Sequence, residues 1–146
     1  MSPDKTVMKS RQLGLSEIGV AEMIWFADRY SEDSVKALYT FPTLKQLEGF
    51  IQTRLNPVMH SGYYNTILNP EQDSLKTKQI RNSFMIFRSS SKAASVEGVD
   101  VDYLSLDEYD RVPKQAEDSA VESMSSSKFG WKRRWSTPKH KWAFVA

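Results

Sequence analysis

Short runs of hydrophobic residues along this chain alternate between the period of a strand and the period of a helix. Residues 6–9 predict a short strand. Residues 17–30 (EIGVAEMIWFADRY) are apolar almost all the way round a helix, which is typical of a helix buried against a sheet. Residues 35–41 (VKALYTF) predict a second strand, rich in apolar and aromatic side chains.

A second helix is predicted over residues 42–57. One of its faces carries an apolar stripe formed by Leu44, Leu47, Ile51 and Leu55. Thr43 and Gln46 have the spacing of a capping box, in which the two side chains bind the first backbone N–H groups of a helix. Pro57 is predicted to end this helix.

The second half of the chain predicts further strands. Residues 75–90 read as two strands that meet near residues 81–83, as a hairpin or an added edge ribbon. Residues 101–108 (VDYLSLDE) predict a buried strand that ends in two carboxylates. A helix is expected within residues 114–127, and residues 131–138 predict another strand. This order favours a single α/β domain with a mainly parallel central sheet, flanking helices and right-handed crossovers.

Composition agrees with one folded domain. The chain has 146 residues, 40% of them hydrophobic and 12% aromatic, which is enough to build a core. It has no cysteine, which excludes disulfides and thiolate metal sites. Its apolar runs are shorter than the roughly 20 residues that a membrane-spanning helix needs.

Charge is unevenly distributed, although the net charge is only +2. Residues 97–122 carry nine acidic side chains against two basic ones, whereas residues 128–141 carry six basic side chains and no acidic one. Trp131, Trp135 and Trp142 are interleaved with this basic run, a pattern that suits contact with nucleic acid. The alternative is a charged strand edge followed by a solvated tail.

The segment KSRQLGLSE, residues 9–17, resembles a phosphate-binding loop whose lysine has moved. In the usual pattern, G-x-x-x-x-G-K-[ST], the lysine precedes the last hydroxyl residue. Here Gly14 and Ser16 match the second glycine and the hydroxyl, but Leu15 stands at the lysine position and Lys9 at that of the first glycine. The alternative is an ordinary turn in which Ser16 caps a helix.

A second motif supports the interpretation of residues 9–17 as a phosphate-binding loop. Asp107 and Glu108 follow a predicted buried strand, where an aspartate can help to hold magnesium and a glutamate can activate water. The alternative is a solvated acidic turn. In a parallel sheet, Ser16 and these carboxylates would meet at the same edge, which favours an ATPase. Ser136, Thr137 and Pro138 close the last predicted strand, where the two hydroxyl groups could sense a terminal phosphate. The alternative is a simple strand-to-turn signal in which Pro138 ends the strand.

The order of these motifs resembles the ATPase domain of the large terminase subunits, the DNA-packaging motors of tailed bacteriophages. Within KSRQLGLSE, residues 9–16 (Walker A) are similar to the loop of a subgroup that carries its lysine first. YLSLDE (Walker B, residues 103–108) is similar to their strand with a catalytic glutamate, and residues 136–138 to their coupling motif. The resemblance covers about residues 5–138 and implies a P-loop NTPase fold of the ASCE/RecA-like class.

The resemblance also implies a role for each matching residue, with ATP and Mg²⁺ as cofactors. It implies nucleotide binding by Lys9, Ser10, Arg11, Gln12, Leu13, Gly14, Leu15 and Ser16. It implies metal binding by Ser16 and Asp107, and coupling of hydrolysis to movement by Ser136, Thr137 and Pro138. Catalysis would involve Glu108 as the base, together with Lys9 and Arg11.

For the whole protein, the resemblance implies an ATP-driven motor that moves double-stranded DNA into a procapsid. It would work as a homo-oligomeric ring in the host cytoplasm, at the portal vertex, with the portal protein and the small terminase subunit and without a membrane. Residues 1–146 are then expected to be part of an ATPase domain, without its C-terminal remainder and the nuclease domain. Two alternatives stay open: another P-loop translocase or helicase-like ATPase, and a non-enzymatic basic nucleic-acid-binding module.

Overall fold

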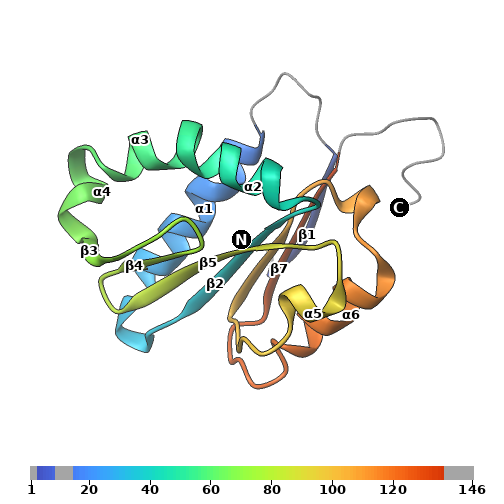
Figure 1. The fold of residues 1–146 in the computed structure, drawn as a ribbon. Helices are drawn as coiled ribbons and strands as arrows, with labels where there is room; N and C mark the ends of the chain where they lie inside the picture. Colours follow the sequence, from blue (N-terminus) through green and yellow to red (C-terminus); the bar gives the residue numbers. More distant parts are fainter. Residues whose placement is uncertain (1–2, 9–14, 137–146) are drawn as a thin grey trace.

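A central sheet lies between two layers of helices in the computed structural model, which describes residues 3–8 and 15–136 (Figure 1). The strands of the described part are β1 (Asp4–Met8), β2 (Lys36–Phe41), β3 (Leu68–Asp73), β4 (Thr77–Ile80), β5 (Ser83–Ser89), β6 (Tyr103–Leu106) and β7 (Trp131–Ser136). The helices are α1 (Leu15–Arg29), α2 (Leu44–Phe50), α3 (Asn56–Met59), α4 (Gly62–Ile67), α5 (Ala93–Val96) and α6 (Lys114–Glu122). Three short turns complete them: the 3-10 turns η1 (Ser31–Asp33) and η3 (Tyr109–Arg111) and the π-helical turn η2 (Ile51–Leu55).

The strands form one sheet in the order β1-β7-β6-β2-β5-β4-β3. The first five in this order are parallel, and β4 and β3 continue the sheet in antiparallel fashion. The carboxyl ends of β1, β7, β6, β2 and β5 therefore share one edge, where ligand sites of α/β proteins form. The α/β class with a mainly parallel sheet, predicted from the sequence, is confirmed.

The predicted hairpin is present as β4 and β5, but it is not an added ribbon. β5 pairs in parallel with β2 over Lys36 to Phe41, so it belongs to the central sheet. Its burial explains this position, because Met85, Ile86 and Phe87 all lie in the core. The edge is formed instead by β3, a strand that the sequence pattern did not predict.

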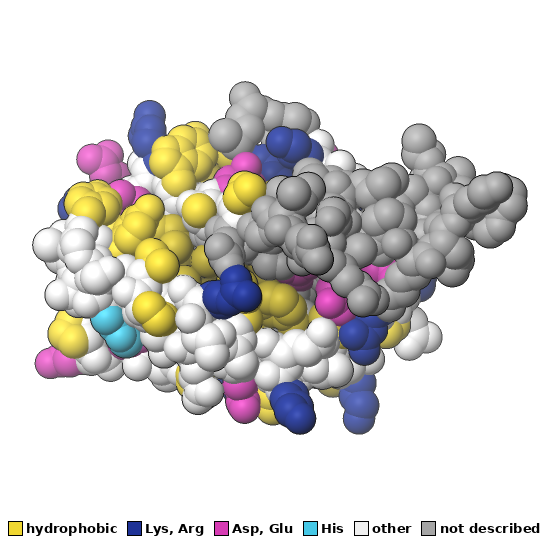
Figure 2. All heavy atoms as spheres, turned by 90° about the horizontal axis from the view of Figure 1, so that it is seen from above, with side chains coloured by type: hydrophobic (Ala, Val, Ile, Leu, Met, Phe, Trp, Pro, Cys, Tyr) yellow, Lys and Arg dark blue, Asp and Glu magenta, His cyan; other side chains and the backbone are white. Residues whose placement is uncertain are grey.

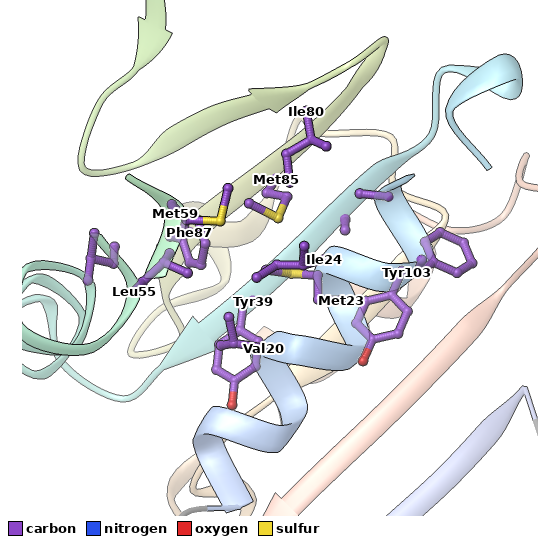
Figure 3. Close-up of a cluster of buried hydrophobic side chains, with 14 of the residues drawn as sticks. Val20, Met23, Ile24, Tyr39, Leu55, Met59, Ile80, Met85, Phe87 and Tyr103 are labelled. Atoms are coloured by element: carbon purple, nitrogen blue, oxygen red, sulfur yellow. The ribbon is translucent and has the colours of Figure 1, made fainter. Parts of the chain in front are cut away.

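Two hydrophobic clusters hold the layers together, one on each face of the sheet. The larger cluster joins α1 and the α2–α4 segment to the sheet, with Met23, Phe26 and Tyr39 fully buried (Figure 3). The smaller one joins α5 and α6 to the other face through Leu104 and Leu106 of β6. Since side chains alternate along a strand, β6 contributes to both clusters.

The helix α1 is less buried than its sequence predicted. Ile18 and Trp25 are 54% and 43% exposed, although the Trp25 ring still lies 6.1 Å from that of Trp131 in β7. Figure 2 shows the molecule from above Figure 1, where hydrophobic side chains lie among charged ones on the described part of the face in view. None of the helices in the described part of the chain has the length and apolar character needed to cross a membrane.

The helix predicted over residues 42–57 consists of α2, η2 and α3, and Pro57 does not end it. Pro57 lies in the first turn of α3, where its missing N–H group costs little, and the chain stays helical to Met59. The wider η2 turn precedes it. Only the Thr43 half of the predicted capping box is confirmed: the Gln46 N–H donates to Thr43 Oγ1 at 3.2 Å, whereas the Gln46 side chain accepts from the Thr43 hydroxyl at 3.0 Å. Leu44, at the start of the predicted apolar stripe, is 43% exposed.

The strand β7 lies inside the sheet, between β1 and β6, so its reading as a charged strand edge is wrong. Its charges are neutralised within the fold. Arg133 is fully buried, with its Nε 2.7 Å from Glu22 Oε1 and its guanidinium over the rings of Trp131 and Tyr103. Further ion pairs of the basic run join Arg134 to Glu117 and Asp4, Lys132 to Asp4, and Lys128 to Asp33. These pairs weaken the reading of this run as a nucleic-acid surface.

Candidate active site

Asp107 lies at the carboxyl edge of the sheet, on the face that carries α1. Along β6, Leu104 and Leu106 point to the α5 and α6 layer, so Tyr103, Ser105 and Asp107 point the other way. The Asp107 N–H donates to Thr40 O at 3.1 Å, which extends the pairing of β6 with β2 by one residue. Asp107 is fully buried.

Both carboxylate oxygens of Asp107 accept hydrogen bonds. The Tyr39 hydroxyl donates to Oδ2 at 2.6 Å, and the backbone N–H of Glu108 donates to Oδ1 at 2.8 Å. Hydrogen bonds to both oxygens satisfy a buried carboxylate and fix its orientation. The prediction that Asp107 follows a buried strand is confirmed, and the fold gives its carboxylate two hydrogen-bond donors.

Glu108 turns away from Asp107, because its φ angle of +47° places it in the left-handed region. Its carboxylate is partly exposed and has two partners. Arg111 Nη1 donates to Glu108 Oε2 at 3.0 Å, and Gln46 Nε2 lies 3.4 Å from each carboxylate oxygen. Gln46 is held in the first turn of α2 by the Thr43 cap. The two neighbouring carboxylates thus face different surroundings.

The end of β7 is tied to the turn that follows Glu108. Ser136 is the last residue of β7, is almost fully buried, and lies beside Met8 at the end of β1. Its hydroxyl donates to Asp110 Oδ1 at 3.0 Å. Thr137 and Pro138, the other members of the predicted coupling segment, lie outside the described residues.

The predicted loop lies between two described elements. Residues 9–14, from Lys9 to Gly14, lie outside the described residues. Leu15 and Ser16 are the first residues of α1, and β1 ends at Met8, so the strand and the helix that a phosphate-binding loop requires are both present.

Comparison with known proteins decides between the families that share this arrangement. The sequence profile of one family, described as "Phage terminase large subunit gpA, ATPase domain", matches residues 4–142. The chain belongs to this terminase family. A search of the curated proteins gives no match.

Solved structures with the terminase fold are also similar to this chain. The Thermus phage P74-26 large terminase ATPase domain superposes with a TM-score of 0.70 at 17% identity, covering 98% of this chain and 63% of that one. An arginine-to-alanine mutant of the same domain gives a TM-score of 0.68 at 16% identity, covering 97% and 62%. The chain thus spans less than two thirds of these domains. The predicted P-loop NTPase fold is confirmed.

Sequence reasoning missed three residues that surround the terminase carboxylates. Arg111 had a weak signal, since it stands three residues after Glu108 with the opposite charge. Gln46 and Tyr39 had none, because they are separated from their partners by 62 and 68 residues. Their positions follow only from the pairing of β2 with β6.

The donor set at Asp107 fits a nucleotide-bound magnesium ion. Among the described residues, no group of three His, Cys, Asp or Glu side chains could form a protein metal cage. Mg²⁺ is usually bound by one or two carboxylates together with substrate phosphates and water. Within residues 3–8 and 15–136, Asp107 is the fully buried carboxylate, on the face that carries α1.

Proposed function

We propose that this chain is an ATP-binding and ATP-hydrolysing motor domain that drives double-stranded viral DNA into a procapsid. The observation that carries the proposal is the position of Asp107 and Glu108. They follow a buried strand of a terminase-family fold, at the sheet edge shared with the end of β1. A metal-binding and a water-activating carboxylate are required there.

The loop holds the phosphates of ATP in this proposal. Its backbone N–H groups, at the start of α1, point to the anion, and Lys9 supplies the charge that the usual loop carries near its end. Arg11 stabilises charge in the transition state. The residues assigned to the nucleotide are Lys9, Ser10, Arg11, Gln12, Leu13, Gly14, Leu15 and Ser16.

Ser16 and Asp107 are assigned to Mg²⁺, and Glu108 to the attacking water. The bound ion neutralises charge that develops on the phosphate oxygens. Asp107 is held for this task by its two hydrogen bonds. Glu108, which is closer to solvent, accepts the proton of the water. Its ion pair with Arg111 is partly exposed and is worth no more than about 1 kcal/mol, so it does not prevent this role.

At the level of the whole protein, the proposal includes a homo-oligomeric ring at the portal vertex in the host cytoplasm. Its partners are double-stranded DNA, the portal protein and the small terminase subunit. Ser136, Thr137 and Pro138 couple hydrolysis to movement, which the contact of Ser136 with the loop after Glu108 supports.

The test is Glu108→Gln in the complete protein. Glutamine keeps the shape of the side chain but cannot take up the proton of water, so ATP binding is expected to remain. The hydrolysis rate is expected to fall by about 10²–10⁴-fold. The control is Glu97→Gln, at an exposed glutamate outside the site. Unchanged hydrolysis in Glu108→Gln would assign the base elsewhere, and a protein that binds no ATP analogue would favour the non-enzymatic alternative.

A further inference from the structure

We propose that Tyr39 is a positioning residue for the metal-binding carboxylate of Asp107. Through its hydrogen bond to Oδ2, it fixes the rotation of the carboxylate, so that Asp107 meets the magnesium ion of a bound nucleotide without reorganisation. This inference rests on the metal role proposed for Asp107. It adds a residue of β2, far away in the sequence, to the machinery of hydrolysis.

The pairing of β2 with β6 brings the two side chains together. Tyr39 lies opposite Ser105 in this pair of parallel strands, and both side chains point to the α1 face. The phenol extends along the sheet towards its carboxyl edge and reaches Asp107, two residues beyond Ser105. The distance from its hydroxyl oxygen to Asp107 Oδ2 is 2.6 Å. Such a short bond to a carboxylate is typical of charge-assisted hydrogen bonds.

Packing fixes the hydroxyl group in place. The Tyr39 ring is fully buried, lies 5.3 Å from the ring of Phe41, and stacks on Phe50 at 6.4 Å with an interplanar angle of 2°. A tyrosine has only two side-chain torsions, so a ring packed in this way leaves its hydroxyl little freedom. Figure 3 shows Tyr39 under α1, close to Val20.

Gly19 makes room for this hydroxyl beneath α1. A Cβ atom at this position would lie 3.2 Å from the Tyr39 hydroxyl oxygen and 3.1 Å from the Trp135 ring. Both contacts are tighter than ordinary van der Waals distances, so the glycine allows the helix to approach the sheet here. The hydroxyl therefore lies under the first turns of the helix that follows the loop, next to the site.

A residue that orients a metal ligand has a measurable effect of its own. Loss of such an outer partner typically lowers metal affinity or activity by about 10–100-fold. A tyrosine that serves only the core would alter stability and leave the response to magnesium unchanged. The dependence of nucleotide binding on magnesium therefore separates the two roles.

Tyr103 is a matched control for Tyr39. It is also fully buried on the α1 face (Figure 3). Its hydroxyl also donates to a carboxylate, Glu22 Oε1, at 2.6 Å. Burial and the charge of Glu22 raise the pKa of Tyr103, so its hydroxyl stays protonated as a donor. It lies four residues before Asp107, away from the sheet edge. Tyr103→Phe thus removes the same chemical group from the same layer.

The experiment measures the dissociation constant of a fluorescent ATP analogue with Mg²⁺ and with EDTA, together with the thermal unfolding midpoint, in the complete protein. Tyr39→Phe is expected to weaken binding about 10-fold or more with Mg²⁺ and to leave binding in EDTA nearly unchanged. Tyr103→Phe is expected to keep the wild-type ratio of the two constants. The ratio is taken within each variant, so a loss of stability does not imitate the effect.

Asp107→Asn separates this inference from the function on which it rests. If this variant keeps the wild-type response to magnesium, the metal role of Asp107 is wrong. If it loses the response while Tyr39→Phe keeps it, only the role of Tyr39 is overturned. Equal changes of the ratio in Tyr39→Phe and Tyr103→Phe would also overturn the role of Tyr39. The effect would then come from core packing and not from the hydrogen bond to Asp107.

Discussion

Glu108 is the residue at which the backbone departs most clearly from regular structure near the site. Its φ angle of +47° costs a non-glycine residue about 1 kcal/mol or more. The hydrogen bond from its N–H to Asp107 Oδ1 helps to hold this conformation. In this turn, the side chain of Asp107 points into the protein and that of Glu108 points towards solvent. One strand end therefore presents a buried carboxylate and a more accessible one, as the proposed metal and base roles require.

A prediction at the same scale concerns the displaced lysine. Lys9→Ala in the complete protein is expected to lose most ATP hydrolysis, because a long lysine side chain at the first position of the loop can reach the phosphates from the opposite side. Leu15→Ala is the control at the position of the usual lysine and is expected to keep most of the activity. Steady-state hydrolysis checks both. Full turnover in Lys9→Ala would show that the charge has not moved.

The sequence predicted Asp107 and Glu108 but not their partners. A run of buried strand residues that ends in carboxylates is visible in the sequence, and local order alone places it at a strand end. Tyr39 and Gln46 became partners only through the packing of β2 and α2 beside β6. No local pattern carries that information, since each contact joins segments more than 60 residues apart in sequence.

At the scale of elements, the sequence predicted β2, β6, β7 and α6 and failed at the sheet edge. The strand β3 contains Asn69, Pro70 and Glu71, residues with low strand propensity. It forms because β4 offers it a partner, and proline is tolerated at an edge. The sequence also did not predict the η2 turn, because a single wide turn hardly changes the helical spacing of apolar residues.

The β3–β4 edge depends on a buried ion pair, which gives a prediction for stability. Lys78 of β4 is fully buried and binds Asp73 at the end of β3, while His60 Nε2 lies 2.6 Å from Asp73 Oδ2. Asp73→Asn leaves the ammonium group without its counter-charge and is expected to lower the free energy of unfolding by about 3 kcal/mol. Urea unfolding at pH 7 measures this, with Glu71→Gln on the exposed part of β3 as control. Equal stabilities would contradict it.

The same pair gives the wild type a stability that depends on pH. Burial raises the pKa of Asp73, but the hydrogen bonds and charges of Lys78 and His60 outweigh it and lower the pKa below its ordinary value of 3.8. A lowered pKa stabilises the folded state above the ordinary value, and this contribution is lost as the pH falls through the lowered one. The difference in unfolding free energy between wild type and Asp73→Asn should therefore shrink below about pH 4.

At the scale of the whole molecule, β7 connects the two layers. Its odd-numbered side chains point to the α1 face, where Trp135 Nε1 donates to Ser105 Oγ at 2.6 Å. Its even-numbered side chains point to the α6 layer, where Arg134 binds Glu117. At its end, Ser136 contacts the loop that carries Glu108 through Asp110. This hydrogen bond is the contact through which the proposed coupling of hydrolysis to movement would act.

This connection predicts that Ser136→Ala lowers DNA packaging more than it lowers ATP hydrolysis. The variant removes the hydrogen bond to Asp110 Oδ1, while Asp107 and Glu108 keep their own partners. The amount of DNA packaged per ATP hydrolysed is expected to fall by about 5-fold or more, a factor that corresponds to the lower end of typical coupling free energies.

Ser83→Ala is the control, because Ser83 is also fully buried and donates one hydrogen bond, to Ala27 O at 2.8 Å, far from the site. Packaging and ATPase assays on the same assembled motors give the ratio. If both serine variants lower hydrolysis and packaging in equal proportion, the end of β7 has only a structural role.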